Sequence, residues 1–287
     1  MQNHDNAVFA YLDFQGEAEY DTATFINFLF SVFSYESRDG QDYTERPKTL
    51  REFRTVVKEL SDAGKRIIIL MDEFESITRN SNFDENFFSC LRSLANTYRV
   101  AYVTSSREDL QKMCHNKEIS DSPFFNIFSS LPLRPFTWDE ALELISVPSE
   151  EEGIALSPYA DRILDMAGLF PLFLQIACSN VFEFLMQNPD GDPNWVEIER
   201  AYMDEADQHY RFIWEGMGSA ARINLRRVAE GKSINRRYAF INEDLERRGY
   251  LVESELGPGL CSDSFRGFVV RQDKPPSGFF RKLGRRS

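Results

Sequence analysis

Apolar residues recur in two different patterns along the first part of the chain. Residues 8–14 (VFAYLDF) are β-prone and mostly apolar, which predicts a strand. Residues 21–35 and 49–63 place their apolar side chains at helical spacing, and Gly64 stands where the second of these helices would end. The pattern therefore predicts a strand followed by two helices.

A continuous apolar run then leads into two acidic residues. Ile67–Met71 does not alternate, which is typical of a parallel strand covered on both faces, and Asp72 and Glu73 follow it directly. Residues 84–98 predict another helix and residues 100–103 a further strand. This alternation of strands and helices predicts an α/β fold with a three-layer domain.

The rest of the chain changes character twice. Residues 129–133 predict one more short strand, and the pattern is helical from Thr137 onward. From Ser219, two predicted helices precede a short hairpin whose turn we place at Leu256–Gly259. Helices followed by a hairpin are typical of a winged-helix domain. The remaining residues, 273–287, are rich in Pro, Gly and Arg and predict a flexible basic tail.

Length and composition narrow the class of protein. The 287 residues are 42% hydrophobic and 28% charged, enough for two domains with buried cores. No apolar run approaches the roughly 20 residues that span a bilayer, and no secretory signal is visible. The four cysteines are too scattered for a zinc or redox motif. These features predict a cytoplasmic protein that does not enter a membrane.

The charge is unevenly distributed. The whole chain has a formal charge of −13, but the residues from Ser219 onward hold 15 Lys and Arg against 8 Asp and Glu, a charge of +7. A basic end on an acidic body is typical of a module that binds nucleic acid, and equally of two domains that attract each other. The sequence leaves both interpretations open.

The acidic pair suggests a specific chemistry. The carboxyl ends of parallel strands are where α/β folds bind their ligands. There, Asp72 would hold Mg²⁺ through water and Glu73 would orient or deprotonate the water that attacks a γ-phosphate. The alternative interpretation is that the pair only caps the helix that follows the strand.

Four segments in chain order resemble the AAA+ ATPases, and within them the STAND branch. Ile67–Glu73 resembles the Walker B strand, Val103–Arg107 the sensor strand and Leu131–Ile145 the entry to the helical lid. Ala167–Leu172 is similar to the Gly-x-Pro signature of that lid, with one residue more between Gly168 and Pro171 or with the match in the register of Leu169-Phe170-Pro171. The resemblance covers nearly the whole chain and depends on the order of the motifs. It implies an ASCE-type P-loop NTPase core, a helical lid and a C-terminal winged helix.

The resemblance also implies site residues. Thr104, Ser105 and Arg107 would face the γ-phosphate, and Gly168 and Pro171 would bring the lid to the bound ATP. Considered without the family, Arg107 could be a solvated residue at a helix start. Gly168 and Pro171 could simply end one helix and begin the next. Mg²⁺ and ATP are the cofactors that the resemblance implies.

The phosphate-binding loop of this family is missing from the sequence. No Gly-x-x-x-x-Gly-Lys-Ser/Thr segment occurs, and the single Gly-Lys pair, Gly64-Lys65, is followed by Arg66. In the family the missing strand would lie beside the one predicted at residues 129–133, which would then lack its partner. Either the sequence begins late relative to a longer parent, or it is a degenerate relative.

These observations lead to one hypothesis and two alternatives. The hypothesis is an AAA+/STAND ATPase module that acts as a nucleotide-dependent switch, inactive or truncated here. It divides the chain into an incomplete nucleotide-binding core (1–135), a lid (136–215), a winged helix (216–272) and a tail (273–287). The alternatives are a DNA-binding protein of initiator or transposition-helper type, and a non-catalytic interaction module. A protein partner or self-association is expected, with DNA as the alternative partner of the basic end.

Overall fold

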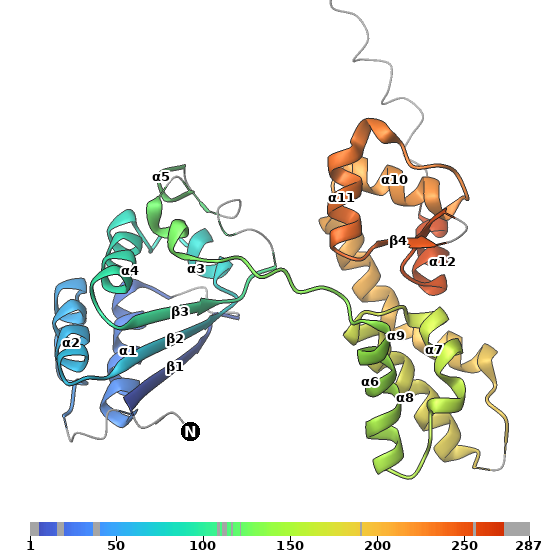
Figure 1. Ribbon diagram of the computed structural model, residues 1–287, viewed down its shortest axis with the longest axis horizontal. Coiled ribbons are helices and arrows are strands. Elements are labelled where there is room, and N and C mark those ends of the chain that lie inside the picture. Colours follow the sequence, from blue (N-terminus) through green and yellow to red (C-terminus); the bar gives the residue numbers. More distant parts are fainter. Residues whose placement is uncertain are drawn as a thin grey trace, which may run out of the picture. The chain divides into compact units, whose positions relative to one another are not determined.

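The computed structural model consists of two compact units, Met1–Leu131 and Pro132–Ser287 (Figure 1). It describes residues 6–15, 20–36, 41–107, 110, 114–115, 117–120, 122–189, 191–254 and 257–272. The basic tail predicted at residues 273–287 lies outside the described residues. No helix in the part of the chain that the structure describes is long and apolar enough to cross a membrane.

The first unit contains a parallel sheet of three strands in the order β1-β2-β3 (Figure 1). The strands are β1 (Ala7–Asp13), β2 (Arg66–Asp72) and β3 (Val100–Thr104). In the register of the sheet, Val8 lies opposite Ile67, which in turn lies opposite Val100. The three strands predicted at these positions and their parallel arrangement are confirmed. Helices connect them, as parallel neighbours require.

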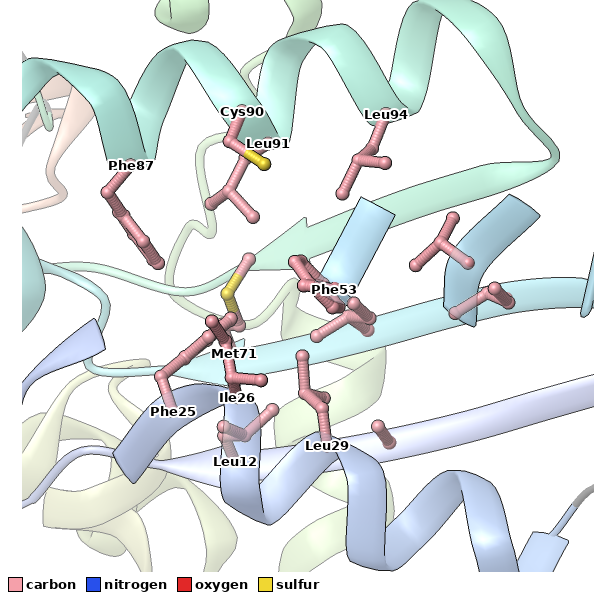
Figure 2. Packing of buried hydrophobic residues seen from close by; sticks show 14 of the residues in the cluster. Leu12, Phe25, Ile26, Leu29, Phe53, Met71, Phe87, Cys90, Leu91 and Leu94 are labelled. Carbon is pink, nitrogen blue, oxygen red and sulfur yellow. The ribbon is translucent and has the colours of Figure 1, made fainter. Parts of the chain in front are cut away.

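Three helices, α1 (Thr22–Glu36), α2 (Leu50–Asp62) and α4 (Glu85–Thr97), pack against one face of this sheet. Thr49 and Asp84 cap the last two through side-chain oxygens that accept backbone hydrogen bonds. Figure 2 shows the core between the layers, where side chains of the helices point toward Leu12 and Met71 of the strands. Short helices complete the unit: α3 (Glu75–Arg79), α5 (Lys117–Ser120) and the 3₁₀ helix η3 (Pro123–Ile127).

Among the described residues of this unit, no element covers the other face of the sheet, which corrects the expectation that β2 is covered on both faces. Along β2 the buried residues alternate with half-buried ones, among them Ile68 and Leu70. On β1, Phe9 and Tyr11 of the same face are exposed. The apolar run alone could not distinguish these cases, because it does not show on which face the helices pack. In the described residues the unit has two layers, the sheet and one layer of helices.

The strand predicted at residues 129–133 does not form. The segment has no regular structure, and Leu131 and Leu133 are exposed. A β-strand exists only where a neighbour takes up its backbone hydrogen bonds. The sheet places only β2 beside β3 among the described strands, so residues 129–133 have no partner there. The prediction was wrong because the composition of a segment does not show whether another strand lies beside it.

The second unit begins with four long helices. They are α6 (Trp138–Glu151), α7 (Ala160–Ala167, preceded by the 3₁₀ helix η4, Ser157–Tyr159), α8 (Pro171–Gln187) and α9 (Trp195–Gly216). Thr137, where the sequence predicts that the helical part begins, caps α6 in a reciprocal capping box with Glu140. On α9, the hydroxyls of the buried residues Tyr202 and Tyr210 are 2.7 Å apart, so each buried polar group has a partner.

The last part of this unit shares its core with those helices. It comprises α10 (Ser219–Ala229), η5 (Arg236–Tyr238), α11 (Ala239–Arg247), the antiparallel strands β4 (Leu251–Ser254) and β5 (Gly257–Leu260), and α12 (Asp263–Arg271). The two helices and the hairpin are confirmed, but Gly257–Leu260 is a strand rather than part of the turn predicted at Leu256–Gly259. The ring of Phe265 lies 5.2 Å from that of Tyr210, which joins α12 to α9.

Candidate site at the carboxyl edge of the sheet

Side chains of β1, of β2 and of the residue that follows β3 meet at the carboxyl edge of the sheet. Asp72, the last residue of β2, accepts a hydrogen bond from the Ser105 hydroxyl at Oδ1. Its Oδ2 accepts a hydrogen bond of 3.1 Å from the Tyr11 hydroxyl on β1. The backbone N–H of Ser105 donates to the Met71 carbonyl over 3.0 Å, which fixes the chain just beyond β3 against the end of β2. Asp72 is therefore held in one orientation from both neighbouring strands.

The same contacts keep the Asp72 carboxylate charged. The hydrogen bond from Ser105 holds the pKa of Asp72 below its ordinary value of 3.8, with smaller contributions from Tyr11 and the Glu73 backbone. The Tyr11 hydroxyl, bonded to this carboxylate, has its pKa raised for the reciprocal reason. At neutral pH the site thus presents an ionised carboxylate with two neutral hydroxyl donors.

Glu73 has an unusual backbone conformation. Its φ of 49° is the only positive φ of a non-glycine residue among those described. This left-handed conformation costs about 1–2 kcal/mol for a residue with a Cβ. Two hydrogen bonds compensate: Glu73 N–H donates to Asp72 Oδ1 over 3.0 Å, and Phe74 N–H donates to the Ser105 carbonyl over 3.0 Å. Strain of this kind concentrates at functional sites.

Two acidic side chains, Glu73 and Glu75, lie close to Arg107. Its Nη2 lies 2.5 Å from Glu73 Oε1, and its Nε lies 3.8 Å from Oε1 of Glu75. The Arg107 backbone N–H also donates to Glu75 Oε1 over 3.3 Å. Glu75 is buried, and its second oxygen, Oε2, has no hydrogen-bond partner within the described residues. Sequence reasoning missed Glu75 and Tyr11. Only the spatial neighbourhood of Arg107 and Asp72 identifies them.

The structure brings together four of the predicted site residues, Asp72, Glu73, Ser105 and Arg107. Thr104 differs from them: it lies opposite Met71 in the register, on the face that the helices cover. The alternative interpretation that the acidic pair caps a helix is not supported by geometry, because the N-cap residue of α3 is Phe74.

Gly168 and Pro171 lie in the second unit. Gly168 ends α7 with a φ of 71°, and Pro171 is the first residue of α8, as the simpler interpretation of these two residues predicts. The Phe136 N–H donates to the Leu169 carbonyl over 2.9 Å. A Cβ at position 168 would lie 2.2 Å from the Cys261 carbonyl oxygen, so this position requires glycine. The turn between α7 and α8 is therefore tightly packed.

The donor set at the carboxyl edge suits one half of a magnesium–nucleotide site. Mg²⁺ prefers hard oxygen ligands, keeps several waters and is usually held by one or two carboxylates together with substrate phosphates. The ionised Asp72 and the Ser105 hydroxyl fit that role. The described residues contain no group of three His, Cys, Asp or Glu able to enclose a metal ion by themselves. The phosphates of a nucleotide would need further hydrogen-bond donors, which the Gly64-Lys65 pair does not supply.

Comparison with known proteins identifies the family to which the chain belongs. The sequence places the chain among the STAND NTPases, as its resemblance to that group predicts, and its fold is that of a solved Walker-type ATPase. More narrowly, the sequence profile of the family described as Novel STAND NTPase 2 (nSTAND2) matches residues 55–234, more than half of the chain. The chain belongs to this family. A search of curated proteins found no match.

Two solved structures illustrate the fold. The Walker-type ATPase PABY2304 of Pyrococcus abyssi has a TM-score of 0.59 and 14% identity, over 91% of this chain and 83% of that one. The ORC2 protein of Aeropyrum pernix, in ADPNP-ADP complexes, has a TM-score of 0.57 and 13% identity, over 93% of this chain and 78% of that one. At such identities the likeness establishes a shared fold.

Proposed function

We propose that this chain is part of an ATP-dependent switch and provides the metal and water side of its nucleotide site. The observation that carries the proposal is the oriented, ionised Asp72, hydrogen-bonded to Ser105 and Tyr11 at the carboxyl edge of the sheet. Asp72 would hold the hydrated Mg²⁺ of Mg-ATP. The ion would neutralise charge on the phosphates when bound. Ile67–Glu73 would then correspond to the Walker B strand.

Glu73 would orient the attacking water, but its carboxylate is occupied by Arg107 at 2.5 Å. While the guanidinium donates to Glu73 Oε1, that oxygen is not available to accept a hydrogen bond from a water. Hydrolysis would therefore require Arg107 to leave Glu73, and the γ-phosphate offers the guanidinium a more highly charged partner. Ser105 and Arg107 would sense that phosphate, and Thr104 would support their strand. In the state described here, Glu73 is not free to act.

The second unit enters the proposal through the family resemblance. Residues 136–215 would form the lid, with Gly168 and Pro171 as its nucleotide-contacting residues, and residues 216–272 would form a winged helix. DNA binding is the less favoured alternative. Asp244 of α11 lies 2.5 Å from Arg247 and 3.8 Å from Arg248, so one acidic side chain already pairs with two basic groups that would face a phosphate backbone.

The proposal can be tested on this chain even if it binds nucleotide weakly. Mn²⁺ replaces Mg²⁺ and broadens the NMR signals of nearby amides, so a titration with Mn²⁺ and ADP detects binding in the millimolar range. We expect broadening of the amides of Asp72, Glu73 and Ser105, and its loss in Asp72→Asn. The matched control is Asp13→Asn, which removes the carboxylate that lies opposite Asp72 on the neighbouring strand.

Equal loss of broadening in Asp13→Asn and Asp72→Asn, or no broadening at this edge, would refute the proposed site. Turnover is a separate question. If the natural coding sequence extends upstream and encodes Gly-x-x-x-x-Gly-Lys-Ser/Thr, the extended protein should bind Mg-ATP tightly in calorimetry. Glu73→Gln should then stop hydrolysis without weakening binding, because the water-orienting group acts only in the chemical step.

A further inference from the structure

We propose that residues 279–287, the end of the basic tail, dock in a hollow between α6 and α8 of the second unit of the same chain. This segment has the sequence FFRKLGRRS and lies outside the described residues. One of its two phenylalanine rings fills the hollow, and the basic side chains next to it pair with acidic residues around the hollow. The inference goes beyond the proposed function and involves no nucleotide.

The first observation is the hollow itself. α6 and α8 pack against each other (Figure 1), and a space of about 220 Å³ lies between them. Most of its wall is apolar and comes from Leu144, Ile145, Pro148, Leu156 and Phe182. An apolar cavity of about 150 Å³ is large enough to bind benzene. The hollow therefore has room for one phenyl ring.

The second observation is that two residues of this wall offer hydrogen-bond acceptors. Pro148 lies inside α6 and has no backbone N–H, so the Leu144 carbonyl lacks the donor that a regular helix would provide four residues later. Glu152 lines the hollow and is exposed. The buried Ser149 hydroxyl already donates to the Ile145 carbonyl over 2.8 Å. An occupant with a positive charge beside its apolar group fits these atoms.

The third observation is the charge of the two helices. α6 contains five acidic residues and α8 contains Glu183, and neither helix contains a Lys or Arg. The ion pairs among the described residues of this unit join other acidic residues. Glu151, Glu152 and Glu183 are therefore not neutralised by those pairs. A surface of one sign of charge attracts a segment of the other sign.

Residues 279–287 match the hollow in both size and charge. They contain two Phe and four Lys or Arg, and no acidic residue. In an extended segment, residues two positions apart face the same side. Phe279 with Arg281, or Phe280 with Lys282, thus presents a phenyl ring and a cation together. The basic end of the chain has a complementary partner in the acidic helices of its own unit.

The tail is long enough to reach the hollow within one chain. The described residues end at Gln272, and Phe280 follows eight residues later, at a distance of up to about 28 Å. α12 and α8 both pack against α7 and against α9. Their axes are therefore two helix spacings apart, about 20 Å. Docking in the same chain does not require a second copy.

Alkylation of Cys178 tests the docking, because this half-buried thiol lines the hollow. The full chain is treated with iodoacetamide in the absence of nucleotide, and mass spectrometry follows the reaction. Half-buried Cys114 of the first unit is the internal control. Phe279→Ser together with Phe280→Ser should speed alkylation of Cys178 by about tenfold, because the docked state loses the burial of one ring. Alkylation of Cys114 should keep its rate.

Charge reversal makes the expectation specific. Glu152→Lys should speed alkylation of Cys178, and so should Arg281→Glu together with Lys282→Glu. All three substitutions combined should restore the slow rate, because opposite charges again face each other. Asp204→Lys, at an exposed position of α9, is the matched control and should leave the rate unchanged. High salt should speed the reaction in the parent chain, because it screens the attraction.

Three results would each overturn the proposal. They are an unchanged rate at Cys178 when both phenylalanines are replaced, no restored protection in the combined charge reversal, and protection that disappears on dilution, which would indicate a second copy as the source of the segment. No Mg²⁺ or nucleotide is present in these measurements. The docking and the proposed nucleotide site therefore succeed or fail independently.

Discussion

The guanidinium of Arg107 lies 2.5 Å from the carboxylate of Glu73, so the chain just beyond β3 holds the acidic residue that follows β2. This ion pair is partly exposed, and such pairs contribute up to about 1 kcal/mol. Glu75, however, is buried, and Arg107 approaches it as well. The buried Glu75 therefore depends on Arg107 for compensation of its charge more than Glu73 does.

Arg107→Ala should destabilise the first unit more than Glu73→Gln does. Removing Arg107 leaves the buried Glu75 carboxylate without this cation, which costs about 1–3 kcal/mol. Removing the Glu73 charge costs about 0.5 kcal/mol. Urea unfolding at neutral pH measures both, and the double variant gives the coupling between residues 73 and 107. Equal effects of the two single variants would contradict a role for Glu75.

Ser105→Ala should make stability less dependent on pH in acid. The hydrogen bond from Ser105 holds the pKa of Asp72 below 3.8, so it contributes stability above that pH, which is lost as pH falls through the folded-state pKa. The variant should therefore lose up to about 1 kcal/mol at pH 6, and the loss should shrink as the pH falls below 3.8. NMR titration of Asp72 should show its pKa move up toward 3.8. An unchanged pKa would refute the assigned cause.

Gly168→Ala should destabilise the second unit strongly. The new Cβ would lie 2.2 Å from the Cys261 carbonyl oxygen, so the backbone would have to move to avoid a clash. The φ of 71° at this position is also unfavourable for a residue with a Cβ. We expect a loss of about 2–4 kcal/mol. Gly153→Ala is the matched control: its φ is 79° but no atom lies within 4 Å of the new Cβ, so it should cost about 1 kcal/mol. Thermal unfolding measures the loss of stability in both variants. Similar losses in Gly168→Ala and Gly153→Ala would show that packing at Gly168 is unimportant.

Asn242→Ala should disrupt the contact between α10 and α11. The Asn224 side-chain amide donates to Asn242 Oδ1 over 2.6 Å, and both residues are buried. Without that acceptor a buried donor has no partner, which costs about 1–3 kcal/mol. Asn188→Ala, which removes an exposed side-chain hydrogen bond to the Phe184 carbonyl, should cost less than about 0.5 kcal/mol. A small effect of Asn242→Ala in denaturant unfolding would mean that water satisfies Asn224.

The sequence predicted what depends on local pattern. The strand at Ile67–Met71 and the helix capped by Asp84 follow from hydrophobic spacing and from capping chemistry, which act within a few residues. The position of Asp72 at a carboxyl edge follows as well, because parallel strands end on the same side of their sheet. The order of motifs was enough to predict that the chain is of the STAND NTPase type.

The tertiary structure decided what depends on partners distant in sequence. Residues 129–133 are apolar enough for a strand but have no neighbour, and the apolar run of β2 does not show that one face stays open. Tyr11 reaches Asp72 across 61 positions of sequence, and Glu75 is buried beside Arg107. Sequence alone determined the three strands of the sheet, the helices between them and the acidic pair, because their causes are local. Only folding determined which side chains hold that pair and which surface remains uncovered, because those contacts join strands and helices far apart in the chain.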